Sequence, residues 1–253
     1  MKSKSLILSV VVALAGFLPQ SQAALYDFPV LGGSTVTSTG NTRLNGDLGV
    51  YPGDSITGFG SVAGTVTGAT HNNDPTAISA HSAASTAYDN LASLAPTLDL
   101  TGHVLGTGDF VLLPSGVYHF GDAAALTGTL TLSGTGDFVF QIGSTLTTAS
   151  SSSISLINGA QAGNVFWQVG SSATLGADTS FDGSILADQS ITLNNGASMS
   201  GRALALNGAV TLDGNEITGV PEPATFWLLT FCASVFGAWR WFAVWRRQQA
   251  GRS

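Results

Sequence analysis

The sequence predicts a mainly β protein: an irregular triangular β-solenoid with one long α-helix packed along one face. Short apolar runs recur at regular intervals and are bounded by Gly, Asn or Asp, as expected of short strands joined by turns. The x-Thr-Leu triplets at 173–175, 191–193 and 210–212 repeat at 18 and 19 residues, and 144–146 is aligned as a fourth copy. This period fits one solenoid turn of three strands and three corners.

The N-terminus predicts a secretory signal peptide. Lys2 and Lys4 precede an apolar run over 6–17, and a small-residue pattern ends at Ala23. The run is too short to remain as a membrane span, so cleavage after Ala23 is expected and residues 1–23 are a signal helix. The mature domain is then 24–219.

The C-terminal segment 220–253 resembles the PEP-CTERM sorting signal of Gram-negative bacteria. Its motif is Val220, Pro221, Glu222 and Pro223. An apolar stretch over 225–239 and an arginine cluster follow, which predicts a transmembrane helix with a cytoplasmic basic end. The resemblance implies an exosortase as processing partner, membrane attachment before cleavage, and a mature form at the cell surface or outside the cell. Arg240, inside the apolar run, departs from the usual pattern.

The charge of the mature region excludes nucleic acid as a partner. Only Arg43 and Arg202 lie in 24–219, against fourteen acids, and that region has no lysine. A nucleic-acid surface needs a basic footprint to displace counterions. The single cysteine, Cys232, lies in the tail, so the domain contains neither disulfides nor a thiol nucleophile.

Three series of strands can be aligned as three faces of the solenoid. One series runs through 138–142, 165–169, 185–187 and 203–205 and is apolar on both sides, so another element must cover it. The other two alternate apolar residues with hydroxyls, as strands with one wet side do. The x-Thr-Leu series is predicted to point outward with Thr145, Thr147, Thr174, Thr192, Asn194 and Thr211. The remaining series is predicted to point outward with Thr129, Thr131, Ser153, Ser155, Ser180, Ser198 and Ser200, interrupted by Asp182.

A helix is predicted over about 75–94. Asp74 is a good N-cap and Pro75 suits the first helical position. A stripe at helical period is expected to face the doubly apolar strands. It consists of Ala77, Ile78, Ala80, Ala84, Ala87, Tyr88, Leu91 and Leu94.

Several ordered segments resemble the secreted microbial ice-binding (antifreeze) proteins, a family built as an irregular β-solenoid flanked by one helix. They lie at 30–37, 45–50, 56–59, 114–118, 137–143, 164–170 and 201–205. The resemblance implies that one flat face contacts ice. Some members carry Thr-Ala/Gly-x-Thr/Asn there; 39–42 and 67–70 match this pattern, and 195–198 departs at its first and last positions.

The x-Thr-Leu face is the favoured ice-binding surface, with the serine-rich face as the alternative. Threonine has a restricted χ1, so its hydroxyl is pre-positioned beside an apolar methyl. Serine orders water less well, so moderate ice activity is expected.

No catalytic residue, metal site or cofactor is predicted. The stretch 178–183 resembles the start of a calcium loop, but Gln189 stands where a bidentate Glu is required. The histidines, His71, His81, His103 and His119, lack ligand spacing. The acids are scattered singly, whereas carboxylate catalysis on sugars needs them clustered.

The competing function is an extracellular matrix or adhesion module that binds exopolysaccharide, which the sorting tail favours. The two functions are compatible, because an ice-binding module in a matrix would hold cells at ice.

Overall fold

The computed structural model describes residues 28–60 and 64–220, which belong to one compact unit. The predicted signal peptide, the sorting motif after Val220 and the predicted C-terminal helix lie outside these residues. Among the residues described, no helix is both long enough and apolar enough to cross a membrane.

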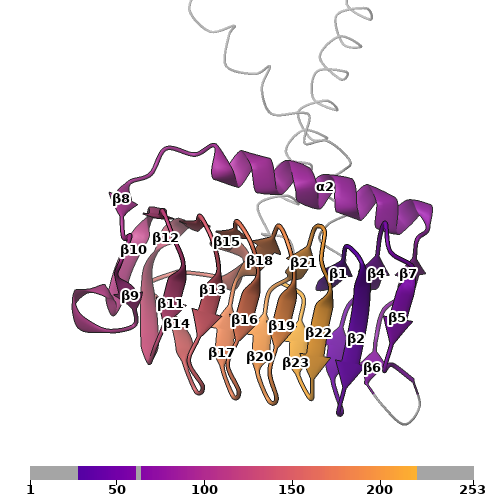
Figure 1. Cartoon of the computed structure of the whole chain (residues 1–253). Coiled ribbons are helices and arrows are strands. Elements are labelled where there is room, and N and C mark those ends of the chain that lie inside the picture. The colour runs from indigo at the N-terminus through magenta and orange to yellow at the C-terminus, as the bar shows by residue number, and fades with distance from the viewer. Residues whose placement is uncertain (1–27, 61–63, 221–253) are drawn as a thin grey trace, which may run out of the picture. The chain divides into compact units, whose positions relative to one another are not determined.

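The described strands form a parallel solenoid with three faces, and α2 (Pro75–Ala92) lies along one of them (Figure 1). The first face, named here the threonine face, is one sheet with the spatial order β9 (Val104–Leu105), β11 (Ala124–Leu126), β13 (Leu146–Thr148), β16 (Ala173–Leu175), β19 (Ile191–Leu193), β22 (Val210–Asp213), β2 (Thr35–Thr39) and β5 (Ser55–Thr57).

The second face, the serine face, begins with the first half of β12 (Thr129–Ile142), beside the start of β10 (Leu112–Phe120). It continues through β14 (Ser153–Ile157), β17 (Ser180–Asp182), β20 (Ser198–Ser200), β23 (Glu216–Thr218), β3 (Arg43–Asn45) and β6 (Thr65–Val66).

The third face lies under the helix. It contains β8 (Leu98–Asp99), the second halves of β10 and β12, β15 (Val165–Val169), β18 (Ser184–Ala187), β21 (Ala203–Ala205), β1 (Val30–Gly32), β4 (Leu48–Val50) and β7 (Thr70–Asn72). Two short 3-10 turns, η1 (Gly108–Phe110) and η2 (Ala162–Asn164), complete the described elements.

The coils are not stacked in chain order. The N-terminal strands dock against the last C-terminal coil, with β1 on β21, β2 on β22 and β3 beside β23 (indigo beside yellow in Figure 1). The chain then runs along α2 to the far end of the solenoid and builds its remaining coils back toward the start. Strands from opposite ends of the domain therefore complete each face.

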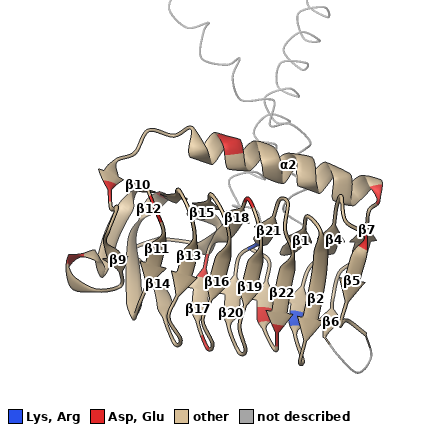
Figure 2. Cartoon of the chain, in the orientation of Figure 1, with Lys and Arg blue, Asp and Glu red and all other residues tan. Residues whose placement is uncertain are grey.

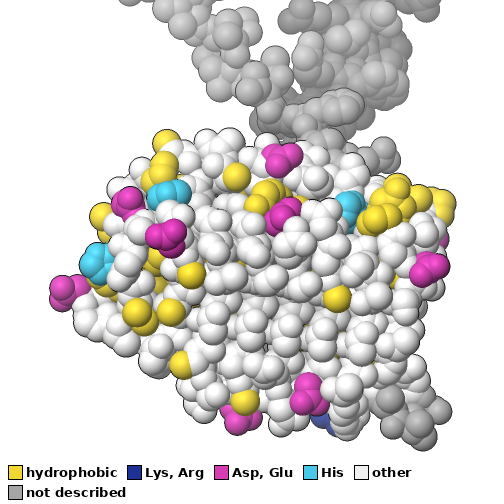
Figure 3. All heavy atoms as spheres, in the orientation of Figure 1, with side chains coloured by type: hydrophobic (Ala, Val, Ile, Leu, Met, Phe, Trp, Pro, Cys, Tyr) yellow, Lys and Arg dark blue, Asp and Glu magenta, His cyan; other side chains and the backbone are white. Residues whose placement is uncertain are grey.

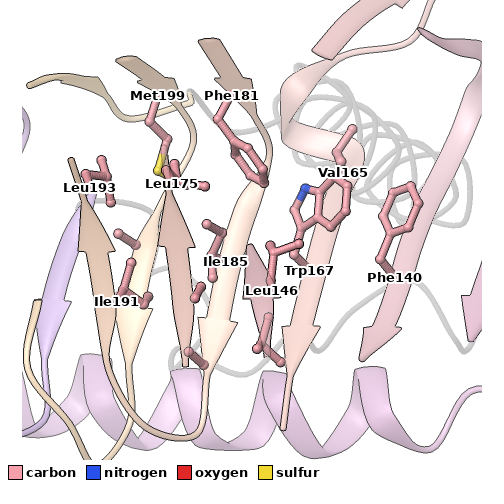
Figure 4. Packing of buried hydrophobic residues seen from close by; sticks show 14 of the residues in the cluster. Phe140, Leu146, Val165, Trp167, Leu175, Phe181, Ile185, Ile191, Leu193 and Met199 are labelled. Atoms are coloured by element: carbon pink, nitrogen blue, oxygen red, sulfur yellow. The ribbon is translucent and has the colours of Figure 1, made fainter. Parts of the chain in front are cut away.

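The core is a set of stacked rows, because parallel in-register pairing places equivalent side chains one above another. The rings of Phe140 and Trp167 stack at 3.9 Å with an interplanar angle of 7° (Figure 4). The ring of Tyr118 extends the stack on the other side of Phe140. The same row continues through Ile185 and Ala203, so aromatic rings give way to smaller side chains along this part of the axis.

The helix prediction is confirmed in its N-cap and corrected in its stripe. The Asp74 carboxylate accepts the backbone N–H groups of Thr76 and Ala77. Buried alanines, including Ala83, allow α2 to lie close to the sheet, over a small cluster with Phe28, Leu31, Leu186 and Leu204. Ile78 and Leu94, placed in the stripe by the prediction, are each 42% exposed. Gln141 Nε2 donates to the carbonyls of Leu91 and Leu94 and so closes the end of the helix.

One repeat was misaligned. The fourth copy, 144–146, was matched to 173–175, but Leu146 pairs with Ala173 and Thr147 with Thr174. The error is a shift of two residues. Because side chains alternate with a period of two, the predicted outward threonines keep their orientation.

Candidate functional site

A row of threonines crosses the centre of the threonine face. Register partners on consecutive strands are Thr147, Thr174, Thr192, Thr211, Thr37 and Thr57. Buried residues flank these threonines except Thr57, as Ile191 and Leu193 flank Thr192, and the buried neighbours Thr148 and Ser38 are polar. Alternation therefore forces the hydroxyls outward. At the far end the row continues with Ala125 and Val104, which carry no hydroxyl.

A second outward row runs parallel to the first, two residues earlier on each strand. Its members are Thr145, Ser172, Ser190, Ala209, Thr35 and Ser55, and each is partly exposed. Ser190 Oγ is used inside the fold, since it accepts the N–H of Ala209 at 3.2 Å. The hydroxyls of the central row make fewer hydrogen bonds within the protein. Thr57 Oγ1 donates to Thr37 Oγ1 at 3.3 Å, and in the described chain the hydroxyls of Thr147, Thr174, Thr192 and Thr211 bond to no other residue.

The two threonine-face rows contain no charged residue, and acidic side chains lie at the margins of this surface (Figure 3). Asn194 and Asp213 are at such a margin, after the inward leucines of β19 and β22. Asp213 Oδ1 accepts the hydroxyl of Thr39 at 3.1 Å, which ties the carboxylate to the next coil. Charged side chains are also few on the rest of the described domain (Figure 2).

The serine face is interrupted by more charges than the sequence indicated. One row runs Thr129, Ser153, Ser180, Ser198, Glu216 and Arg43, and the other runs Thr131, Ser155, Asp182 and Ser200. Burial raises the pKa of Asp182, and a hydrogen bond from Ser200 opposes the shift. The hydroxyls of Thr129 and Ser153 bond to each other at 2.8 Å, so they are partly withdrawn from water.

The two tetrapeptides that match the Thr-Ala/Gly-x-Thr/Asn pattern, and the third that departs from it, do not lie on a flat face. Residues 39–42 and 195–198 form corners between the threonine and serine faces, and 67–70 forms a corner leading to β7. Gly40 and Gly196 have φ of 66° and 74°, as such corners require. Thr42 is fully buried and therefore contacts no external partner.

The residues described hold no group of three or more His, Cys, Asp or Glu side chains placed to bind a metal. Asp178, at the start of the calcium-like stretch, is a corner residue with φ of 57°. His71 lies between Asp74, at 2.8 Å from Nδ1, and Asp47, at 3.5 Å from Nε2. His81 Nε2 lies 2.8 Å from the carbonyl of Leu206 and holds the helix to the sheet. These two histidines have structural partners.

Comparison with known proteins identifies the family. The sequence model described as "Ice-binding-like" matches residues 30–218. The chain belongs to this ice-binding-like family. It is 48% identical over 243 residues to an ice-binding protein of Nostoc sp. strain HG1, covering 87% of this chain and 88% of that one. It is 32% identical to an ice-binding protein of Flavobacterium frigoris, covering 78% and 74% of the two chains.

Solved structures of ice-binding proteins share the fold. The crystal structure from the Antarctic ascomycete Antarctomyces psychrotrophicus matches with a TM-score of 0.74 and 40% identity, over 79% of this chain and 98% of that one. One from an Antarctic biological consortium matches with a TM-score of 0.73 and 38% identity, over 85% and 96%. The match covers almost the whole of each of these two crystallised chains.

The sequence prediction missed Thr37, Thr57, Thr35 and Ser55 on the threonine face. They lie on β2 and β5, far from the recognised repeat. The available signal was the alternation in Thr35-Val36-Thr37 and Ser55-Ile56-Thr57, which matches Thr145-Leu146-Thr147.

Proposed function

We propose that this chain is an ice-binding protein and that the threonine face is its ice-contacting surface. The central row from Thr147 to Thr57 carries the proposal, because it is an unbroken series of outward hydroxyls from six neighbouring coils. The names of the relatives support the activity. The identity of the face rests on the geometry alone.

The spacing of these rows suits an ordered layer of water. Neighbouring coils lie about 4.8 Å apart, and alternate residues on a strand lie roughly 6.5–7 Å apart. The threonine face is therefore a two-dimensional grid held by the backbone. Each threonine of the central row has a restricted χ1 and carries a methyl beside its hydroxyl, so water is anchored at the hydroxyl and enclosed by the methyl. Many weak contacts then add up on a surface that is already ordered.

The serine face fits this role less well. Asp182, Glu216 and Arg43 project among its hydroxyls, and charged groups bind water in geometries that a lattice does not repeat. The threonine face has only uncharged side chains in its two rows. This contrast favours the threonine face, with moderate activity because its second row includes serines and an alanine.

We further propose that the protein is exported and acts without catalysis. The signal peptide ending at Ala23 and the sorting motif at 220–223 support export and exosortase processing, and both proposals stem from the sequence. Mass spectrometry of the mature protein from its native cells tests them, since intact termini would exclude this processing. The matrix alternative depends on the same tail and on no feature of the described solenoid.

The decisive experiment is ice-affinity partitioning of residues 24–220 together with recrystallisation in frozen sucrose. The wild-type domain is expected to enter the ice fraction and to slow grain growth. Replacing Thr174, Thr192 and Thr211 by tyrosine should raise the inhibitory concentration by at least about tenfold, because one large ring separates many contacts from the lattice.

A matched variant replaces Ser180, Ser198 and Ser200 on the serine face by tyrosine. It should retain activity within about twofold, since these side chains lie on a different face from the proposed contact. If the two triple variants lose activity equally, the threonine face is not the specific contact. Exclusion of the wild-type domain from ice would overturn the proposed function itself.

A further inference from the structure

A buried polar row lies behind the corner that joins the threonine and serine faces. It contains the residues immediately before β14, β17, β20, β23 and β3, which are polar except for one alanine: Ser152, Thr179, Ala197, Asn215 and Thr42. All five are at most 2% exposed. Buried polar side chains are almost always hydrogen-bonded, so their partners show which segments of the chain they connect.

The hydroxyls in this row hydrogen-bond to neighbouring coils. Ser152 Oγ donates to the carbonyl of Leu126 at 3.2 Å. Thr179 Oγ1 lies 2.9 Å from Thr148 Oγ1 and donates to the carbonyl of Ala149. Thr148 Oγ1 in turn accepts the N–H of Gly176. The row therefore links successive coils from inside.

Asn215 makes more of these hydrogen bonds than any other residue in the row. Its Nδ2 donates to the carbonyls of Asn194 at 2.9 Å and Ala197 at 3.0 Å, on the preceding coil. Its Oδ1 accepts the N–H of Asp213 at 2.6 Å, on its own coil.

The backbone of Asn215 extends the linkage to the N-terminal coil. Its carbonyl accepts the N–H of Arg43 at 2.7 Å, and its N–H donates to Thr42 Oγ1 at 3.3 Å. One residue thus joins three successive corners, at the junction where the N-terminal coils dock on the C-terminal ones.

We infer that Asn215 is a positioning residue for the ice-contacting surface, an inference that rests on the proposed function. Its amide holds the chain two residues after Thr192 and two residues after Thr211. The junction that it braces is also where Thr211 meets Thr37. Asn215 itself is 2% exposed, so its replacement removes no group that ice can touch. In a variant that remains folded, a loss of ice activity must then arise from altered spacing or order of the threonines.

The test compares Asn215→Ala, Asn215→Asp and Asn215→Thr in residues 24–220. Asn215→Asp keeps the shape and the acceptor for Asp213 but loses both donors. Asn215→Thr keeps one donor and is the residue type found at positions 179 and 42 of the same row. The alanine and aspartate variants should raise the concentration that inhibits recrystallisation by about threefold to tenfold, within the range of remote positioning changes. The threonine variant should recover part of the activity.

The control is Leu186→Ala, which removes a buried side chain beneath the helix and away from the threonine face. It should lower the thermal midpoint while leaving ice activity within about twofold. If it lowers ice activity as much as Asn215→Ala at a similar midpoint, Asn215 has only a stabilising role.

Methyl NMR of the threonines gives a readout that needs no ice. Asn215→Ala should shift and broaden the methyl signals of Thr192, Thr211 and Thr37 while leaving Thr147 unchanged. Unchanged signals at all four positions overturn the inference. If the wild-type domain binds no ice yet these methyls respond, the proposed function fails and the bracing of this surface stands.

Discussion

Thr211 and Thr37 are register partners on the neighbouring strands β22 and β2, although they come from opposite ends of the domain. Their pairing continues the threonine row across the junction between the last C-terminal coil and the N-terminal coils. The surface proposed to contact ice is therefore composite. Its extent depends on docking between distant segments as well as on the recognised repeat.

The composite surface predicts a role for Thr37. Thr37→Tyr should raise the inhibitory concentration in recrystallisation assays by about threefold to tenfold, because the ring projects from within the threonine row and separates neighbouring hydroxyls from the ice. Thr218→Tyr, on an exposed position of the serine face, is the matched control and should have little effect. Equal activity of the Thr37 variant and wild type would confine the contact to the C-terminal coils.

The row can also be extended. Ala125 pairs with Thr147 and points outward at the end of the threonines. Ala125→Thr adds a pre-positioned hydroxyl and methyl on a strand, where β-branched residues are favoured. Ice activity should increase by up to about twofold, with the thermal midpoint unchanged or slightly raised. Ala125→Ser separates the contribution of the hydroxyl from that of the methyl. No gain from either variant would place Ala125 outside the contact.

Trp167 is predicted to be the largest single contributor to the core. It is fully buried, stacks on Phe140, and donates its ring N–H to the carbonyl of Asp182 at 3.3 Å. Trp167→Ala should reduce the free energy of unfolding by about 3–5 kcal/mol, as deletion of a buried aromatic side chain does. Chemical denaturation measures the loss, and the partly exposed Phe166→Ala is the smaller comparison. A cost below that of Phe166→Ala would contradict the packing described.

Asp74 gives stability a defined pH dependence at the start of α2. The N–H of Ala77 and the His71 side chain hold the pKa of Asp74 below its ordinary value. A carboxyl with a lowered pKa stabilises the fold fully above its unfolded pKa of about 4. This stabilisation is lost as the pH falls through the lower value reached in the fold.

Asp74→Asn isolates this effect, because asparagine is an equally good N-cap without the charge. The thermal midpoint of wild type should exceed that of Asp74→Asn near pH 6, and the difference should shrink as the pH drops below 4. A difference that persists unchanged at low pH would exclude the charged form as its source. Asp74→Ala, which removes the cap at every pH, should be less stable than Asp74→Asn throughout.

Local patterns were sufficient for the architecture. The 18–19-residue period, the alternation around Thr174 and Thr192, and the Asp74-Pro75 cap indicated a solenoid with one flanking helix. The two-residue misalignment at 144–146 did no harm, because alternation in a strand preserves the outward side. Leu94 does not belong to the buried stripe because the helix ends at Ala92, and Ile78 does not belong to it because helical period defines a stripe but not its width or centre. Only the contact with the sheet decides those.

By itself, the sequence determined which side chains alternate inward and outward on each strand, since φ/ψ geometry and burial act over a few residues. It also determined the net acidity and the small-residue helix. Tertiary structure alone decided that β2 docks on β22, that Glu216 and Arg43 enter the serine face, and that Thr42 turns inward at a corner. Those outcomes depend on pairing between remote strands. Parallel pairing of short strands has almost no local code, because any in-register partner with matching apolar residues satisfies the same backbone hydrogen bonds.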